Sequence, residues 1–404
     1  MSAVHYPAHW TSQKLKYVAS LRSGEGITSD DISDAGEYPV YGGNGVRGYT
    51  SSYTHDGTYP LIGRQGALCG NINYASGKFW ASEHAVVVSV RRSHVARWLG
   101  EVLRSMNLNQ YSQSAAQPGI SVEVIENLPI PVPPEQEQEA IAAFLDRETA
   151  RIDGLIAEKK RMLALLEEKC AALISRFVTR GLDPNAPLKP FGQEWLGEIP
   201  EHWEVRTLKR ASSRIDTGTT PAASFMDGSL PSDFTWFTPS DFEHGGVIAE
   251  SNRKIPQEAV DEGEAKVFPS HSLMVIGIGA TLGKVASSRS TFSANQQINV
   301  ITPLESVRWD YLLYVLQGYE HVFRAHANSA TLPILNQERL GVIRVPVPPW
   351  AEQDAIVTRL NESRAEYAEV SQLLGSSISL LQERRAALIS AAVNGQVPLE
   401  GMTG

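Results

Sequence analysis

The 404-residue sequence has only two cysteines, Cys69 and Cys170. Neither has a second cysteine or a histidine at metal-ligand spacing, so we predict two reduced thiols and no disulfide framework or zinc site. No uninterrupted apolar run reaches the roughly 18 residues of a membrane-spanning helix. The first residues lack the basic and apolar regions of a signal peptide, and we therefore expect a cytoplasmic location.

Positive charge is also scarce. The chain has 36 Lys and Arg against 45 Asp and Glu, a formal net charge of -9. Residues 1–134 contain ten basic and ten acidic residues, and residues 181–349 contain fourteen basic against nineteen acidic residues. This balance excludes a protein that coats nucleic acid by bulk attraction, but not one that binds through local basic clusters.

Several catalytic signatures are missing from the sequence. There is no Asn-Pro-Pro-aromatic or Asp-Pro-Pro-aromatic tetrapeptide of the kind that amino-methyltransferases use. The H-E-x-x-H and G-x-S-x-G motifs are missing too. We therefore expect neither a catalytic site nor a cofactor in this chain.

The sequence does contain a long internal repeat. P-V-P-P at residues 131–134 recurs at 346–349, and A-A-L-I-S at 171–175 recurs at 386–390, both at an offset of 215. Glu-Gln pairs after the prolines keep the same offset. An unbroken register over about 45 residues is expected of one continuous helix, because a single insertion would rotate every later side chain by about 100°.

Both copies carry a heptad stripe, which is typical of supercoiled helices. Its members are Ile141, Leu145, Ile152, Leu155, Met162, Leu166 and Leu173, and then Ile356, Leu360, Tyr367, Val370, the polar Ser377, Leu381 and Leu388. A Pro-Pro pair gives each segment an extended entry, and Gly181 ends the first.

A globular region precedes each predicted helix. P-A-H-W at residues 7–10 resembles P-E-H-W at 200–203, and S-A-A-Q-P-G-I at 114–120 aligns with S-A-T-L-P-I-L at 329–335. Alternating runs such as residues 85–90 and 297–301 indicate strands. The predicted order, in an α/β (α+β) fold, is a globular domain over 1–134, a helix over 135–180, a linker over 181–193, a globular domain over 194–349, a helix over 350–396 and a tail over 397–404.

The combination of these motifs resembles the specificity subunit of type I restriction-modification systems. L-P-I-P-V-P-P-E-Q-E-Q-E-A-I (residues 128–141) and R-V-P-V-P-P-W-A-E-Q-D-A-I (344–356) carry the resemblance, together with the P-x-H-W starts. Y-P-V-Y-G-G-N-G-V-R-G-Y (38–49) also resembles a segment common in recognition domains of that family. The resemblance covers essentially the whole chain.

This resemblance implies two target recognition domains that each read one half of a split double-stranded DNA sequence. Two antiparallel helices would hold the domains apart in an approximately two-fold arrangement. The helices would also dock two modification subunits, which bind S-adenosylmethionine and methylate adenine, while restriction subunits that use ATP and Mg complete the nuclease. The chain itself would be non-catalytic and would contact no membrane.

Base readout requires donors and acceptors held on rigid loops. Our candidates in the first domain are Asn44, Arg47, Tyr49, Arg64, Gln65, Lys78 and His84. Those in the second are Thr238, Ser240, Lys284, Arg289, Asn295, Gln296 and Gln297. A helix of about 45 residues spans roughly 65 Å, close to two turns of B-DNA, so we expect helix length to set the spacer. The partner-docking candidates are Leu163, Leu173, Phe177 and Leu388.

The segment V-I-G-I-G-A-T-L-G-K at residues 275–284 could suggest a phosphate loop. It departs from that motif at Ile278 and Val285, where glycine and Ser or Thr are required. L-I-G-R-Q-G-A-L-C-G at 61–70 is its counterpart, so we align Gly63, Gly66 and Gly70 with Gly277, Gly279 and Gly283 as a shared backbone turn. Two alternatives stay open: a coiled-coil scaffold with two protein-binding domains, and a nucleotide-dependent enzyme.

Overall fold

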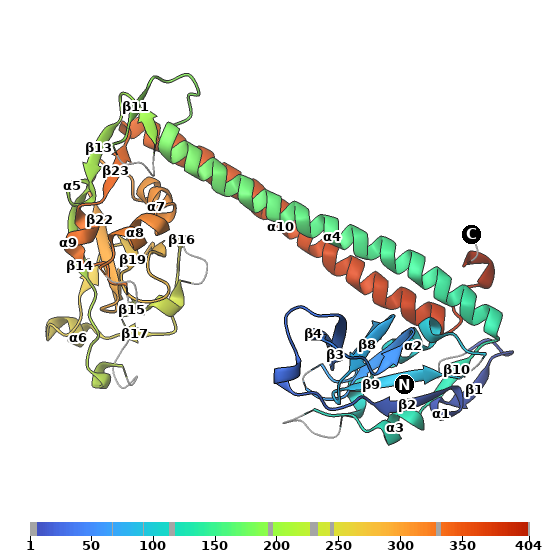
Figure 1. The fold of residues 1–404 in the computed structure, drawn as a ribbon. Coiled ribbons are helices and arrows are strands. Elements are labelled where there is room, and N and C mark those ends of the chain that lie inside the picture. Colours follow the sequence, from blue (N-terminus) through green and yellow to red (C-terminus); the bar gives the residue numbers. More distant parts are fainter. Residues whose placement is uncertain are drawn as a thin grey trace. The chain divides into compact units, whose positions relative to one another are not determined.

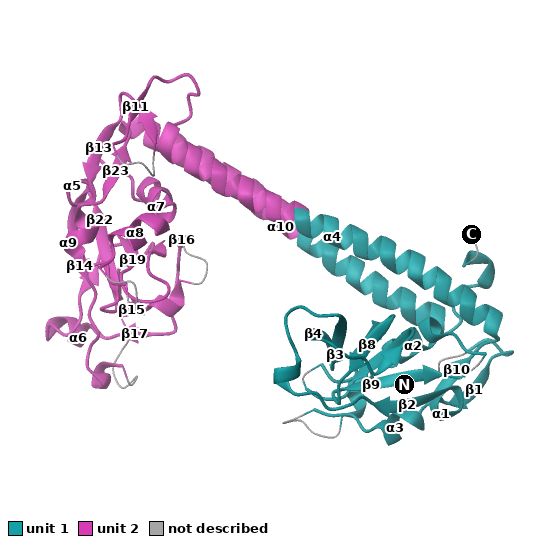
Figure 2. Cartoon of the chain, in the orientation of Figure 1, with its two compact units in different colours: residues 1–161, 373–404 teal, residues 162–372 magenta. Residues whose placement is uncertain are grey.

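A computed structural model describes residues 6–66, 68–91, 93–112, 118–192, 197–226, 233–242, 246–328 and 333–402. The chain divides into two compact units, residues 1–161 with 373–404 (unit 1) and residues 162–372 (unit 2) (Figure 2). Each unit has a mixed helix and strand part and one segment of each long helix, α4 (Glu135–Arg180) and α10 (Trp350–Val393) (Figure 1). The predicted α+β class with two globular parts and two long helices is confirmed.

The elements of unit 1 before α4 are β1 (Thr11–Lys14), α1 (Leu15–Val18), β2 (Ala19–Ser23), η1 (Ser29–Asp31), β3 (Tyr38–Gly42), β4 (Gly45–Thr50), β5 (His55–Asp56), β6 (Tyr59–Gly63), β7 (Ile72–Ala75), β8 (Lys78–Ala81), β9 (Ala85–Val90), α2 (Ala96–Ser105), η2 (Leu108–Tyr111), α3 (Val122–Glu126) and β10 (Pro129–Val132). They form sheets of order β2-β9-β6-β7 and β4-β3-β8-β5, and β1 pairs with β10.

The elements of unit 2 between the long helices are β11 (Leu188–Pro190), β12 (Glu198–Pro200), β13 (Glu204–Thr207), α5 (Leu208–Ala211), β14 (Ser212–Thr217), η3 (Ala223–Phe225), β15 (Phe234–Phe237), η4 (Pro239–Asp241), β16 (Gly246–Val247), β17 (Lys254–Ile255), α6 (Gln257–Asp261), β18 (Val267–Phe268), β19 (Leu273–Ile276), β20 (Val285–Ser287), β21 (Phe292–Ala294), β22 (Ile298–Pro303), α7 (Trp309–Gln317), α8 (Glu320–His326), α9 (Gln337–Gly341) and β23 (Arg344–Val347). Their sheets have the orders β14-β22-β19-β20-β16 and β17-β15-β21-β18, with pairs β13-β23 and β11-β12. The sheet order of unit 1 is therefore repeated in unit 2, with β16 and the pair β11-β12 added.

The central sheet of each unit lies between two apolar cores. On β9, Val86 and Val88 join the core that contains Trp98 of α2, while Val87 joins the core that contains Phe79 of β8. Successive side chains of a strand point to opposite faces, so a strand covered on both faces is apolar throughout. This explains why residues 85–88, the first part of the run predicted as a strand, are all apolar.

Buried glutamines fix the beginnings of both long helices. Gln138 Nε2 donates to the carbonyl oxygen of Pro133 (2.9 Å), and its Oε1 accepts from the backbone N–H of Val95 (3.0 Å), just before α2. Gln353 makes the two equivalent bonds in unit 2. The repeated Glu-Gln pair therefore includes a side chain that joins each helix to its globular part.

The neighbouring glutamates bind the P-x-H-W segments. His9 Nε2 lies 2.8 Å from Glu137 Oε1, and His202 Nε2 lies 2.8 Å from Glu352 Oε2. Trp10 Nε1 also donates to Glu137, at 2.9 Å. Each P-x-H-W motif thus belongs to the same structural unit as the helix start that follows its globular part.

Both long helices end at a glycine in the left-handed conformation, Gly181 (φ 69°) and Gly395 (φ 70°), which releases the chain from the helix. A Cβ atom on Gly395 would lie 2.4 Å from Pro7, and one on Gly181 would lie 3.1 Å from Trp203. Each helix therefore ends against a P-x-H-W segment, α10 in unit 1 and α4 in unit 2.

The predicted heptad seam is wrong in part. Ile141 and Leu145 are buried in the core of unit 1, but Leu155, Met162 and Val370 are exposed. The first turns of a long helix pack on a globular part, and farther along a strict seven-residue stripe turns by about 20° per heptad relative to a straight α-helix. The middle of the helices therefore presents part of the predicted stripe to solvent.

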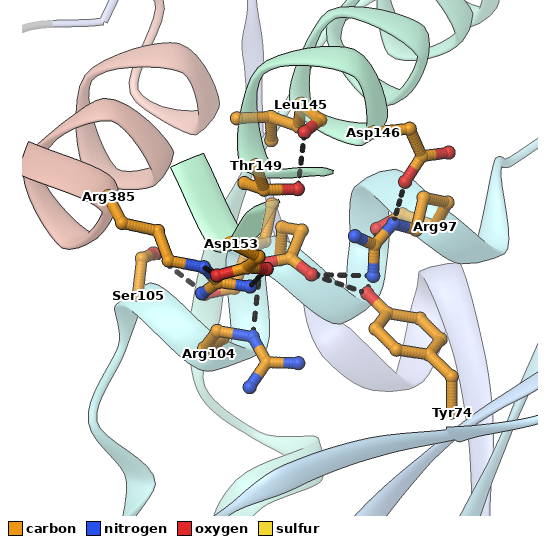
Figure 3. Close-up of polar contacts among 11 residues, drawn as sticks. Tyr74, Arg97, Arg104, Ser105, Leu145, Asp146, Thr149, Asp153 and Arg385 are labelled. Atoms are coloured by element: carbon orange, nitrogen blue, oxygen red, sulfur yellow. Dashed lines mark hydrogen bonds and ion pairs between the residues drawn. The ribbon is translucent and has the colours of Figure 1, made fainter. Parts of the chain in front are cut away.

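Charged contacts join the helices of unit 1 to its globular part (Figure 3). Arg97 of α2 pairs with Asp146 of α4 and with the buried Glu101 of α2 (2.8 Å to Glu101). On the helix pair, Arg385 of α10 donates to Asp153 of α4 at 2.8 Å. These contacts place the α4 and α10 segments of unit 1 side by side.

The predicted tail folds back on unit 1. Met402 is buried in the core that also contains Ile389, and Arg147 of α4 donates to the Met402 carbonyl at 3.2 Å. The aligned segments at residues 114–120 and 329–335 lie largely outside the described residues. Among the described helices, none combines the length and apolar character needed to cross a membrane.

Candidate nucleic-acid interface

The glycine segments form the same turn in both units. Gly66 and Gly279 have φ values of 90° and 96°, a conformation that glycine adopts without strain. Lys284 is followed by the strand β20, whereas a phosphate loop opens a helix. The shared turn is therefore a structural feature of both globular parts. The helix that a phosphate loop requires after its lysine is replaced here by a strand, which argues against the nucleotide-dependent alternative.

One part of our glycine alignment is wrong by a residue. Gly70 N–H donates to the Gly63 carbonyl (2.7 Å), and Gly283 N–H donates to the Ile276 carbonyl (2.9 Å). Arg64 N–H donates to His84, as Gly277 N–H donates to Gln297. Gly63 thus corresponds to Ile276, and Gly277 corresponds to Arg64, because backbone hydrogen bonds and not glycine content define the equivalent positions.

In unit 1 this turn lies beside the ends of two parallel strands. Val40 and Tyr41 of β3 pair with Trp80 and Ala81 of β8, so both strands run in the same direction. Their carboxyl ends lead into the loops that carry the exposed candidates. We call this edge of the sheet, where the loops that follow β3 and β8 meet the turn at Gly66, the strand-end site of unit 1.

The strand-end site of unit 1 is a cleft of about 460 Å³. Four candidates line it together, namely Asn44, Arg47, Gln65 and His84. Asn71 donates to the Asn44 side chain at 3.0 Å, and His84 Nε2 lies 3.0 Å from Glu83. Asn44, Arg47 and Gln65 are exposed and His84 is half-exposed, so amide, guanidinium and imidazole groups are available in one concave surface.

Three candidates of unit 1 lie elsewhere. Lys78 begins β8, at the opposite end of the strand, where its Nζ lies 4.7 Å from the Tyr53 ring centroid. Tyr49 pairs with Pro39 toward the same end of β3. Arg64 adjoins the turn, but its guanidinium donates to Ser23 at 3.2 Å.

Unit 2 has an equivalent strand-end site. Asn295 N–H donates to the Phe237 carbonyl as Ser82 N–H donates to Tyr41, both at 2.9 Å. The loop after β15 carries Thr238 and Ser240, whose hydroxyl oxygens lie 2.8 Å apart. The structure therefore brings Thr238 and Ser240 beside the loop that carries Asn295, Gln296 and Gln297.

Much of the polar capacity in this second site is used locally. Thr238 forms a capping box with Asp241, in which the Thr238 N–H donates to Asp241 Oδ2 at 2.7 Å. Asn295 is buried, and its Oδ1 accepts from the Gln297 N–H at 2.9 Å. Ser240 and Gln296 are exposed and Gln297 is half-exposed, so these three side chains face solvent more than the other two.

Sequence reasoning missed Arg253. Its guanidinium donates to Thr238 Oγ1 (3.0 Å) and to Ser240 Oγ (3.3 Å), and its carbonyl accepts from Trp236 N–H. It thus lies just before β17, the strand that pairs with β15, whereas Arg47 lies within β4, the strand that pairs with β3. Arg47 stands within β4 and Arg253 just before β17, so the sequence offers no shared position that relates the two arginines.

Two candidates of unit 2 lie away from its strand-end site. Lys284 donates to the Phe242 carbonyl at 3.4 Å and lines a cleft of about 680 Å³ with Glu167 and Arg364 of the long helices. Arg289 is exposed in the loop between β20 and β21, before the start of β21. Lys284 therefore lies beside the long helices, and Arg289 lies before the amino end of β21, whereas the strand-end site lies at the carboxyl end of that strand.

The docking candidates on the long helices differ in exposure. Phe177 packs against the core of unit 2, and Leu388 packs against the core of unit 1. Leu163 and Leu173 are half-buried. The strongly exposed apolar side chains are others that sequence reasoning did not select, including Leu165 and Leu380, which are 55% and 64% exposed.

Curated relatives match the sequence of this chain over different lengths. The specificity subunit of the type I restriction enzyme EcoprrI from Escherichia coli is 46% identical over 137 residues, 33% of this chain and 34% of that subunit. The chain therefore spans about a third of that relative in the match. A putative type I restriction enzyme specificity subunit from Haemophilus influenzae is 23% identical over 358 residues, 87% of this chain and 86% of the relative.

Solved structures and a family model complete the comparison. A chain from a structure on complex assembly and conformational transition of the type I R-M system has a TM-score of 0.75 at 17% identity, covering 97% of this chain and 100% of that one. The HsdS subunit from Thermoanaerobacter tengcongensis has a TM-score of 0.55 at 17% identity, with coverages of 98% and 99%. The model of the type I restriction modification DNA specificity domain matches residues 7–163 and again 200–367. Because this model matches most of the chain, once in each repeat, the chain belongs to the type I restriction-modification DNA specificity family.

Proposed function

We propose that this chain is the non-catalytic specificity subunit of a type I restriction-modification complex. Residues 1–134 and 194–349 would be its two target recognition domains, each reading one half of a bipartite double-stranded DNA target. The observation that carries this proposal is the repeated strand-end site, which has the same backbone hydrogen bonds in both units but different side chains. Two domains that share a backbone arrangement but differ in their polar side chains would be able to recognise two different half-sites.

The chemistry of the strand-end sites supports DNA readout. Arginine recognises guanine through two hydrogen bonds, and Asn or Gln recognises adenine in the same way. The cleft of unit 1 offers Asn44, Gln65 and Arg47, and the site of unit 2 offers Gln297 and Arg253. Because the chain carries a net charge of -9, most of the phosphate contacts would come from partner subunits that close around the duplex.

The long helices would set the spacer and dock two adenine-methyltransferase subunits. Leu155 and Val370 are both exposed and stand 215 residues apart, as do Leu165 and Leu380. The repeat therefore offers one apolar surface twice, which suits two copies of one partner. We propose these four residues as docking positions alongside Leu163 and Leu173.

Chemistry would reside on the partners of this chain. S-adenosylmethionine would bind to the modification subunits, and ATP and Mg would bind to the restriction subunits. The role of this chain would be to choose the DNA sequence and to hold the modification subunits on it.

The decisive experiment is a genome-wide map of adenine methylation in a host that expresses the modification subunits with and without this chain. We expect a bipartite motif with a fixed spacer only when the chain is present. An identical map in both strains would overturn the proposal. In a gel-shift experiment, a complex that assembles with the modification subunits but retards no duplex would favour the scaffold alternative.

A further inference from the structure

The two strand-end sites correspond residue by residue. Gln65 forms an isolated bridge with Gly119, as Ile278 does with Ile334, so Gln65 and Ile278 are equivalent. The bonds from Arg64 and Gly277 to the carbonyls of His84 and Gln297 make those two residues equivalent. The backbone therefore supplies a common frame in which side chains can be compared position by position.

Two further pairs follow from the strands. Tyr41 and Phe237 are equivalent, because each accepts the backbone bond from the neighbouring loop. Asn44 and Ser240 are each the third residue after them. The side chain of Arg47 lies against Gly42, and the Arg253 guanidinium donates to Thr238, so the two arginine side chains reach the residues that directly follow Tyr41 and Phe237. Three pairs thus differ in chemistry, whereas the arginine pair is the same in both units.

The differing pairs carry different recognition chemistry. Gln65 is an exposed amide that can bond adenine, whereas Ile278 is half-exposed and apolar and matches the methyl group of thymine. His84 corresponds to Gln297, and Asn44 corresponds to Ser240, so an imidazole replaces an amide and an amide replaces a hydroxyl. These substitutions leave the backbone frame unchanged.

We infer that the pairs Gln65/Ile278, Asn44/Ser240 and His84/Gln297 determine which bases each domain reads, with Ile278 contacting a thymine methyl group. Arg47 and Arg253 perform the same task in both domains. Lys78 and Arg289 lie at the opposite strand ends and take no part in discrimination. This inference rests on the proposed function and adds the residues that make the two half-sites differ.

The test exchanges side chains at the best-defined pair. Gln65→Ile and Ile278→Gln are each expressed with the modification subunits, and methylated adenines are mapped by sequencing. Gln65→Ile should change base preference within one half-site, and Ile278→Gln should change it within the other. Each change should be on the order of tenfold in the methylation ratio between the original base and its competitor, with an unchanged spacer.

The control is Val342→Gln, which likewise replaces an apolar residue of unit 2 by an amide, at an exposed position, and it should reproduce the wild-type motif. Wild-type motifs in both exchange variants would overturn the inference, as would one variant that altered both half-sites. If the Ile278→Gln chain gives no methylation, Gln65→Ile decides alone, because Gln65 is exposed and its replacement leaves the cores intact. The absence of any bipartite motif with the wild-type chain would instead refute the proposed function.

Discussion

Gln138 and Gln353 show how much one side chain contributes to the placement of a helix. Each is buried, and each joins a proline carbonyl before the long helix to a backbone N–H before α2 or α7. A buried backbone group that loses its partner costs about 1–3 kcal/mol. The repeated Glu-Gln pair is therefore a structural requirement of the helix start.

We predict that Gln138→Ala lowers the free energy of unfolding of unit 1 by about 2–4 kcal/mol, because it leaves the buried Pro133 carbonyl and the half-buried Val95 N–H without their side-chain partner. Calorimetric unfolding of the purified chain measures this change. The control is Gln136→Ala, an exposed glutamine in the same first turn, which should change stability little. Equal effects of the two substitutions would contradict this role of Gln138.

Asp216 gives unit 2 a pH-dependent contribution to stability. Burial of its carboxyl group favours the neutral form, but hydrogen bonds from Lys266 (2.7 Å) and Arg214 outweigh burial and lower the pKa of Asp216 from 3.8 to about 2. A folded-state pKa below the unfolded value means that the ionised group stabilises the fold above about pH 4, and that this contribution is lost as the pH falls toward about 2.

We therefore predict that Asp216→Asn lowers the melting temperature at pH 7, and that the difference from wild type shrinks as the pH falls from about 4 toward about 2. Thermal melts across this pH range measure the difference. Glu305→Gln, at an exposed carboxylate of the same unit, serves as the control. A difference that stays constant between pH 7 and pH 3 would rule out titration of Asp216 as its cause.

At the scale of elements, the long helices show which features a repeat can predict. The unbroken offset of 215 and the Pro-Pro entries predicted where α4 and α10 begin. The face that each residue occupies could not be predicted, because a heptad stripe does not state whether its partner is another helix or a globular core. Leu155 and Met162, which the stripe assigned to the seam between the helices, are therefore found exposed.

We predict that the double variant Leu165→Glu and Leu380→Glu weakens binding of the modification subunits by on the order of tenfold or more, since exposed apolar anchors dominate many interfaces. Both side chains are more than half exposed, so the cores of the chain should remain intact. Affinity is measured by titration calorimetry, with the melting temperature as a check of folding. Gln382→Glu, at an exposed position of α10, adds one negative charge near Leu380 without removing an apolar side chain, and it should bind normally. Unchanged affinity of the leucine variant would exclude these docking positions.

At the scale of the whole molecule, helix length is the proposed measure of the DNA spacer. Deleting residues 158–164 and 373–379 removes one heptad from each long helix at matching positions of the repeat. The helices become about 10 Å shorter, which corresponds to roughly three base pairs of B-DNA. Methylation mapping should therefore show two unchanged half-sites with a shorter spacer. An unchanged spacer with altered half-sites would refute the role of the helices as a ruler.

The order of parts could be predicted from the sequence alone: two globular regions of mixed composition, each followed by a Pro-Pro entry and a long helix. These features are local or periodic along the chain, so spacing and composition are enough to reveal them. The glycine turns were also recognised because they occur twice. Several candidate readout residues could also be named from the sequence, since their side chains are suitable donors or acceptors and they stand on predicted loops.

Which of those residues lie close together depends on the pairing of strands in the folded chain. Parallel pairing of β3 with β8 and of β15 with β21 brings Asn44 beside His84 and Ser240 beside Gln297, while Lys78 lies at the opposite end of its strand. The structure also revealed Arg253 and corrected the glycine alignment by one residue. Strand pairing joins residues far apart in sequence through backbone hydrogen bonds, and those bonds leave no trace in the identity of the side chains.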